Sequence, residues 1–328
     1  MTKLFIGPMS KNTVDVVADI CNSTGKSIGL IPSRRQVDYK GGYVNNWTTE
    51  AFVEYARLQS PHIVLQRDHG GPFQGQEEES LYHDAKLDFD LLHIDPWKEY
   101  KDMDEATVHT INLIKFCNSI NPDCYYEIGT EQAIREYKPS GLEKFIISVS
   151  RGLGPLFSKV KYAVIQGGTR IEGTRNIGNF DEKRCAAMVE VCNRHGLLSK
   201  EHNGDYLTPA SIRRRFELGL DSLNIAPEFG VIETQCILEE ILNHFDEKSL
   251  DRFYSICYDS EKWVKWLPSS VNCFMNEMKK HVIIRTCGHY MFSTEEFGDI
   301  KNQYLDVDQK IQRKIKQRIE EIMCAAEL

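Results

Sequence analysis

The stretch Gln66-Arg67-Asp68-His69-Gly70-Gly71 sets a carboxylate beside an imidazole directly after the apolar run Ile63-Val64-Leu65. This pattern predicts a β-strand that ends in a loop with polar chemistry at its exit. In a (β/α)8 barrel the reactive groups lie at the C-terminal ends of the strands, where neighbouring residues can reach different partners. Asp68 and His69 are therefore predicted to serve one site. A capping Asp beside a surface His would give the same pair, so the rest of the chain decides.

Further short apolar runs alternate with helical patterns on both sides of this stretch. The helical pattern after the first run has Val14, Val17, Ala18 and Cys21 at apolar positions and stops near Gly25. Including the run at 63–65, the predicted strands cover residues 4–7, 27–31, 63–65, 91–95, 124–129, 162–166, 197–201 and 222–226. Eight strands with helices between them predict an α/β fold of the (β/α)8 TIM-barrel type.

The alternation stops after Gly230. Residues 231–328 have helical patterns only, among them 232–245 and a charged closing helix over 307–326. We therefore predict a barrel domain at 1–230 and a helical C-terminal extension at 231–328, packed on the barrel or on a partner subunit.

Composition limits the classes of function. The 328 residues are 41% hydrophobic and 27% charged with a net charge of −8, which fits a large α/β domain and argues against a nucleic-acid partner. There is no signal-peptide pattern, and no run approaches the roughly 20 apolar residues that span a bilayer. The ten cysteines include no Cys-x-x-Cys pair. We expect a cytoplasmic protein with reduced, structural cysteines and no membrane partner.

Almost every predicted strand ends in polar residues, which in a barrel would converge at one mouth. Each has a structural alternative, such as a turn at Asp95 or a paired buried carboxylate at Glu127. Taken together they favour a shared site. The residues predicted to face a substrate are Ser33, Arg34, Arg35, Gln66, Asp95, Gly167, Gly168, Arg170, Glu201, Asn203, Gly204, Asp205 and Asn224.

The order of these motifs resembles one known family. Residues 200–208 (KEHNGDYLT), followed by 217–226 (ELGLDSLNIA), resemble the late-barrel block of class II aldolases of the fructose- and tagatose-bisphosphate type. Asp68-His69, Ile94-Asp95 and Glu127-Ile128-Gly129 match earlier motifs of that family in the same order. The resemblance covers roughly residues 1–230. With the helical tail, it is closest to the group named for the non-catalytic subunit of D-tagatose-bisphosphate aldolase.

The resemblance implies a divalent metal, usually zinc, that polarises a ketose carbonyl and stabilises an enediolate. His69 and His202 match two metal histidines of the family. Asp68 matches its proton-transferring acid, and Asn224 matches the residue that holds the substrate.

Two departures from the family stand out. The family's strand-six histidine is missing, since Gly168-Thr169-Arg170 stands in its place, and Glu127 is the predicted third ligand, with Gln166 or Glu201 as lesser candidates. Asp205 replaces a small hydroxyl residue of the phosphate loop and would repel a phosphate. A phosphate would then need Arg170 first, or Arg34 or Arg35, whereas an unphosphorylated sugar could use Asp205 as an acceptor.

The sequence thus predicts a metal-dependent, aldolase-like lyase that acts on a sugar or sugar phosphate, with a homo-oligomer or an aldolase subunit as partner. A related sugar epimerase is one alternative. A non-catalytic subunit that stabilises a tagatose-bisphosphate-type aldolase is another, and a plain sugar-phosphate binder is the third.

Overall fold

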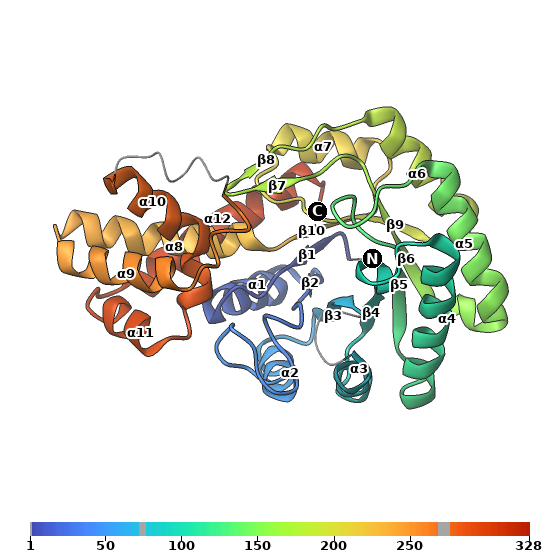
Figure 1. The fold of residues 1–328 in the computed structure, drawn as a ribbon, viewed down its shortest axis with the longest axis horizontal. Coiled ribbons are helices and arrows are strands. Elements are labelled where there is room, and N and C mark those ends of the chain that lie inside the picture. Colours follow the sequence, from blue (N-terminus) through green and yellow to red (C-terminus); the bar gives the residue numbers. More distant parts are fainter. Residues whose placement is uncertain (1, 72–76, 268–275) are drawn as a thin grey trace.

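The computed structural model describes residues 2–71, 77–267 and 276–328. Within these residues, eight parallel strands form a closed barrel with the spatial order β1, β10, β9, β6, β5, β4, β3, β2 (Figure 1). The predicted (β/α)8 fold is confirmed, and each predicted strand overlaps an observed one. The barrel strands are β1 (Leu4–Ile6), β2 (Ile28–Leu30), β3 (Ile63–Gly70), β4 (Leu91–Ile94), β5 (Tyr125–Ile128), β6 (Val160–Ile165), β9 (Leu198–Glu201) and β10 (Ser222–Ile225).

The helices around the barrel follow local sequence signals. The first of them, α1, starts at Ser10, whose hydroxyl accepts the amide of Thr13, and ends at Gly25, which has a left-handed φ of 69°. Its Val14, Val17 and Cys21 face the core, as the apolar spacing predicts. The helices between the strands are α1 (Lys11–Thr24), α2 (Thr49–Gln59), α3 (Glu77–Lys86), α4 (Met103–Ile120), α5 (Pro139–Leu153), α6 (Glu182–Arg194) and α7 (Pro209–Glu217).

Several short helices and strands lie in the loops, and a helical extension follows the barrel. A small antiparallel hairpin of β7 and β8 lies between β6 and α6. The short elements are η1 (Pro96–Lys98), η2 (Gly154–Lys159), β7 (Ile171–Glu172), β8 (Arg175–Asn176) and η4 (Gly288–Met291). The extension contains α8 (Pro227–Asn243), α9 (Glu247–Asp259), α10 (Asn276–Cys287), α11 (Glu295–Lys301) and α12 (Val307–Ala325).

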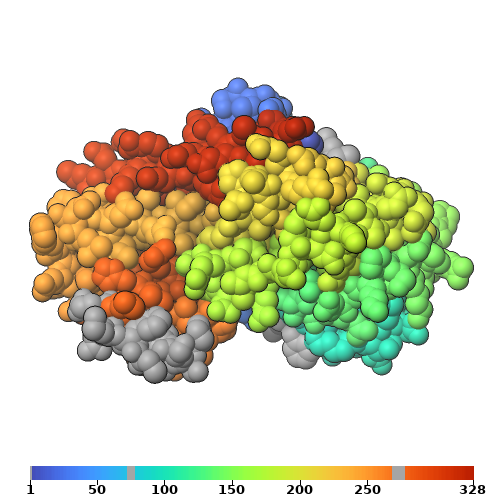
Figure 2. Space-filling view, turned by 90° about the horizontal axis from the view of Figure 1, so that it is seen from above, coloured from blue at the N-terminus to red at the C-terminus, as the bar shows by residue number. Residues whose placement is uncertain are grey.

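The extension is joined to the barrel at both of its ends. The boundary expected at residue 230 falls inside α8, which leaves the barrel and packs against α9 and α10 (Figure 1). The last helix, α12, returns and packs against α1, α7 and α8. Figure 2 shows its red surface beside the yellow surface of α7 and the orange surface of α8. Because α1 and α7 flank the position of the eighth barrel helix, α12 fills that position and completes the outer ring.

Two predictions about the whole chain can be compared with the described residues. The described cysteines are free thiols, and all of them except Cys324 are buried. No helix in the described ranges is long and apolar enough to cross a bilayer.

Candidate metal centre

The interior of the barrel is layered along its axis. Near the N-terminal ends of the strands lies a small apolar cluster of Phe5, Ile31, Leu91 and Tyr162. Above it, Lys200 Nζ lies 2.5 Å from Gln66 Oε1 and 2.7 Å from Glu127 Oε2. These three residues come from β9, β3 and β5, which are not all neighbours, so they meet across the barrel interior. All three are fully buried.

In the polar layer below the site, the charges of Lys200 and Glu127 balance each other. The Lys200 ammonium lies 3.4 Å from the centroid of the Phe5 ring, a cation–π contact that helps to offset its burial. Burial lowers the pKa of Lys200, and Glu127 opposes that shift. Burial also raises the pKa of Glu127, but Lys200, His93 and His202 together outweigh it and hold that pKa well below its ordinary value. The pair is therefore ionised, and it holds Glu127 in a fixed place beneath the mouth.

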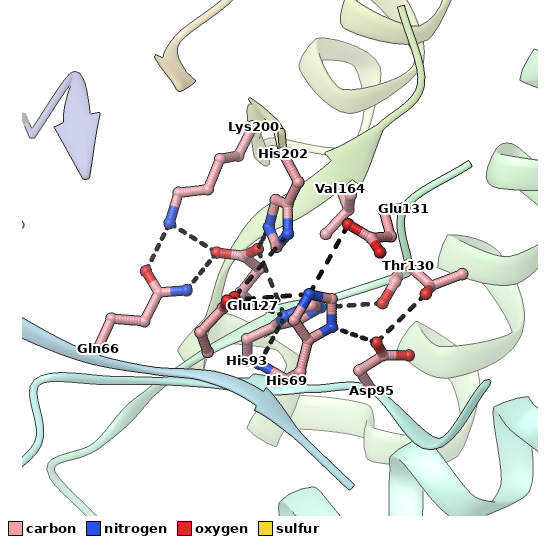
Figure 3. Close-up of polar contacts among 12 residues, drawn as sticks. Gln66, His69, His93, Asp95, Glu127, Thr130, Glu131, Val164, Lys200 and His202 are labelled. Carbon is pink, nitrogen blue, oxygen red and sulfur yellow. Dashed lines mark hydrogen bonds and ion pairs between the residues drawn. The ribbon is translucent and has the colours of Figure 1, made fainter. Parts of the chain in front are cut away.

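The mouth contains a compact group of metal-ligating side chains. Asp68, His69, His93 and His202 each offer one ligand atom, and these four atoms all lie within 4.8 Å of one another. Figure 3 shows the three histidine rings gathered at this point. Both His93 and His202 are buried, and Asp68 and His69 are partly buried. Three imidazoles and a carboxylate are a donor set that suits zinc.

A backbone irregularity in β3 allows two adjacent residues to face the same mouth. The register between β3 and β4 shifts between Arg67 and Gly70, and His69 has a φ of 48°, in the left-handed region. A bulge of this kind re-aims a side chain, and it is common next to functional sites. Arg67 anchors the strand on its outer side, where it makes a bidentate pair with Asp84 at 2.7 and 2.8 Å.

Each histidine is held by an acceptor on one ring nitrogen. His69 Nδ1 lies 2.6 Å from Asp95 Oδ2, and His202 Nε2 lies 2.6 Å from Glu127 Oε1. His93 Nε2 lies 3.0 Å from the Gly129 carbonyl oxygen.

These contacts fix both the tautomer and the orientation of each ring. In a neutral ring, the nitrogen that donates to an acceptor carries the proton, so the other nitrogen of the same ring holds the lone pair. For His93 that other nitrogen, Nδ1, also accepts the backbone amide of His69 at 3.2 Å. Those other nitrogens are the ones near Asp68: His69 Nε2 is 3.8 Å, His93 Nδ1 is 3.7 Å and His202 Nδ1 is 3.9 Å from its carboxylate oxygens. Histidines that bind metals in proteins are supported in the same way, by a carboxylate or a carbonyl on the far nitrogen.

The electric field at the mouth favours a cation. Burial lowers the pKa of His69, but Asp68 and then Asp95 raise it to about 10. Burial lowers the pKa of His93 too, but Glu127, Asp68 and Asp95 together outweigh it, so the pKa is raised. Burial raises the pKa of Asp68, yet the neighbouring histidines, His69 first, lower it below its ordinary value. Positive charge is thus stabilised at this point, and a divalent ion would supply it in place of protons.

Several predicted site residues belong to this centre in other roles. Asp95, predicted to face the substrate, is fully buried, and it supports His69 while it accepts a hydrogen bond from Thr130 at 3.2 Å. Gln66 lies in the polar layer below the mouth, where its Oε1 accepts a hydrogen bond from Lys200 and its Nε2 donates one to Glu127. Glu127, predicted as a metal ligand, is not in the group of four and supports His202 instead.

Other predicted residues lie outside the mouth. Glu201 points to the outer side of β9, where Arg215 of α7 lies 2.6 Å away, because alternate residues of a strand face opposite sides and His202 faces inward. Gly167 packs against the Glu201 carboxylate, since a Cβ there would lie 2.5 Å from Glu201 Oε1. The buried Arg34 donates to the Gly71 carbonyl. Gly204 donates its amide to Asn224 O at 2.8 Å.

Asp205 caps a helix. Its Oδ1 accepts the amides of Ala226 and Glu228 at 3.0 and 2.8 Å, at the N-terminus of α8. Burial, followed by the charge of Glu228, raises its pKa to about 8. With both amides on one oxygen and 1% exposure, Asp205 meets neither a phosphate nor a sugar hydroxyl, so both roles considered for it are corrected.

The remaining predicted residues lie near the centre or line other cavities. The Asn224 side chain is 3% exposed, and neither its Oδ1 nor its Nδ2 has a partner among the described residues. Asn203 donates to Glu131, whose Oε2 is 3.9 Å from His69 Nε2. Ser33 pairs with Asp68 through an isolated β-bridge. Gly168 and Arg170 line a cavity of about 600 Å³, and Arg35 lines another of about 690 Å³.

His93 is the residue that the sequence analysis missed. It lies two positions before Asp95 on β4, so both residues share the inward face of the strand. The alternation of inward and outward residues along 91–95 places His93 on the same side as Asp95, although His93 stands inside an otherwise apolar run.

Comparisons with known proteins show the fold. No protein-family model matches the sequence, and no curated protein sequence matches it either. A solved structure described as a probable tagatose 6 phosphate kinase from Sinorhizobium meliloti 1021 has a TM-score of 0.83 and 16% identity, and the match covers 99% of this chain and 100% of that one.

More distant solved structures share the barrel. A fructuronate-tagaturonate epimerase from Cohnella laeviribosi has a TM-score of 0.68 and 10% identity, with 99% of this chain and 81% of that chain covered. A fructose-bisphosphate aldolase from Campylobacter jejuni has a TM-score of 0.63 and 10% identity, with 99% and 90% covered. At 10–16% identity these likenesses show a shared TIM-barrel fold.

Proposed function

We propose that this protein is a metal-dependent, aldolase-like lyase that cleaves or forms a carbon–carbon bond in a sugar or sugar phosphate. The observation that carries the proposal is the convergence of His69, His93 and His202, each with its far nitrogen already bonded to an acceptor. Three such histidines leave room for a further ligand, which is the usual arrangement of a catalytic zinc site.

The residues present fit a divalent ion. Three imidazole nitrogens and a carboxylate oxygen already lie within 4.8 Å of one another, and this donor set is one that zinc accepts. His69, His93 and His202 would hold the ion. When bound, the ion supplies Lewis-acid charge beside a substrate oxygen.

The proton chemistry falls to Asp68. Its pKa is lowered, so it is ionised, and its Oδ1 is buried without a hydrogen-bond partner among the described residues. We assign it the transfer of the proton that accompanies carbon–carbon cleavage. Asn224 has an amide free to donate to and accept from a sugar oxygen at the same end of the barrel.

The test is an assay of zinc-loaded protein with ketohexose phosphates and bisphosphates, in which triose phosphate is measured by coupled reduction or oxidation of a nicotinamide. We expect triose phosphate to form, a chelator to abolish it and zinc to restore it. Zinc-loaded protein that leaves every sugar of the panel intact would contradict the proposal.

An epimerase is the second candidate, because it would use the same metal and the same kind of proton transfer at Asp68. Product analysis separates the two: a lyase yields two fragments, whereas an epimerase yields an isomer with the same number of carbons. The non-catalytic-subunit alternative drew its support from the missing strand-six histidine, and His93 on β4 removes that argument.

A further inference from the structure

A second polar cavity opens where the barrel meets the extension. It has a volume of about 690 Å³, and its lining residues come from the loop after β2 and from the segments before and after α10. The described lining residues are Arg35, Tyr43, Glu261, Lys262, Val264, Lys265 and Tyr290.

The cavity is rich in positive charge. Three of its lining residues, Arg35, Lys262 and Lys265, are cations, and Glu261 is the only carboxylate among the described lining residues. Within the described ranges, none of the three cations has an ion-pair partner. Burial lowers the pKa of Lys265 to about 8, and the nearby Arg35, Lys262 and Lys98 add to the shift. Cations held close together without a counter-ion repel one another, so an anion that enters here gains from all of them.

Aromatic contacts and hydrogen bonds hold the residues that line this cavity in place. The Lys265 ammonium lies 4.3 Å from the ring centroid of Trp266 and 5.3 Å from that of Tyr290. Trp266 Nε1 in turn donates to the Tyr290 hydroxyl at 3.1 Å. The Tyr43 amide donates to the Arg35 carbonyl at 3.0 Å, and Ser293 Oγ donates to the Tyr43 carbonyl at 2.7 Å, so the barrel loop is tied directly to the extension.

Lys98 connects this cavity to the candidate metal centre. It ends η1, three residues after Asp95, and it is partly buried. Its charge interacts with Asp95, Glu131 and Asp68 on one side and with Arg35 on the other. Lys98 is therefore within electrostatic range of groups in both sites.

We propose that this cavity binds a phosphate ester at the end of the sugar substrate remote from the reacting carbonyl, and that the extension supplies Lys262 and Lys265 for this purpose. The inference rests on the proposed function, and it gives the extension a role in substrate choice. A phosphate dianion matches the surplus of cations better than a neutral sugar or a single carboxylate, and the planar Arg35 guanidinium can bind two of its oxygens.

The first experiment measures the binding of inorganic phosphate to the whole protein by calorimetry. The variants are Lys265→Met, Arg35→Met and their combination, and Lys248→Met on the exposed face of α9 is the matched control. We expect each single variant to lose about tenfold in affinity and the double variant more, with the control unchanged. A double variant that binds phosphate as the unmodified protein does would overturn the proposal. This arm needs neither a metal nor turnover, so it remains informative if the proposed lyase activity fails.

The second experiment separates a substrate phosphate from a free anion. D-Fructose 6-phosphate and D-fructose are titrated into the zinc-loaded protein and its Lys265→Met variant. We expect the variant to weaken binding of the phosphorylated sugar about tenfold and to leave binding of the free sugar unchanged. Equal effects on both sugars would show that the cavity does not recognise the substrate's phosphate.

Discussion

His93 Nε2 lies 3.0 Å from the carbonyl oxygen of Gly129, so in the neutral ring the lone pair is on Nδ1, which accepts the backbone amide of His69 at 3.2 Å beside the barrel mouth. β5 ends at Ile128, one residue before Gly129, and β4 and β5 pair in register from Leu91 and Tyr125 to Ile94 and Ile128. The orientation of a candidate metal ligand is therefore set by strand pairing. Asp95 and Glu127 perform the same task for the other two histidines through their carboxylates.

Asp95→Asn is expected to weaken metal binding about 10- to 100-fold without loss of the fold, because an amide orients His69 less firmly and does not raise its basicity. The measurement is a competition titration of zinc against a chromogenic chelator. Asp123→Asn, an exposed change, is the control. Equal zinc affinity in the Asp95 variant and the control would remove Asp95 from the centre.

Asp68→Asn is expected to lower turnover by roughly 10²-fold or more, because the amide keeps the size of the side chain but cannot carry the proton. Zinc content, measured on the same sample, should stay stoichiometric, since three histidines remain. Unchanged turnover would show that another group transfers the proton. Loss of zinc would identify Asp68 as a metal ligand.

The barrel and three of the four residues grouped at its mouth could be proposed from sequence, for a physical reason. Strands and helices leave periodic apolar patterns, and Asp68 and His69 follow such a pattern directly. Which partner a side chain meets is not periodic: His202 and Glu201 are adjacent, yet one faces the mouth and the other faces Arg215. The place of Asp205 at the start of α8 depends on contacts between distant segments, which no local pattern contains.

Arg215→Met tests the outward assignment of Glu201. It leaves the Glu201 carboxylate buried without its cation, so we expect the free energy of unfolding to fall by about 3–5 kcal/mol. Arg213→Met on the exposed face of the same helix should change it little. Zinc content should be the same in both variants. If denaturant unfolding shows equal stability for the two, the buried pair does not contribute as described.

Because the pKa of Asp205 is raised, we expect the free energy of unfolding to depend on pH. That pKa is raised from 3.8 to about 8, so between these values the folded protein holds a proton that the unfolded chain has lost. This contribution to stability is complete below about pH 4 and is lost as the pH rises to about 8. Asp205→Asn keeps an oxygen for the Ala226 and Glu228 amides but does not titrate. Its stability relative to the unmodified protein should therefore rise from pH 5 to pH 8 in urea unfolding, and a constant difference would contradict the assignment.

The most direct test of the metal centre is the zinc content of His93→Ala after zinc loading and gel filtration, measured by elemental analysis. We predict about one zinc per chain in the unmodified protein and in the control His62→Ala, whose imidazole is exposed, and a substoichiometric amount in His93→Ala. Equal zinc in His93→Ala and the control, or no zinc in the unmodified protein, would contradict the three-histidine centre on which the proposed lyase activity depends.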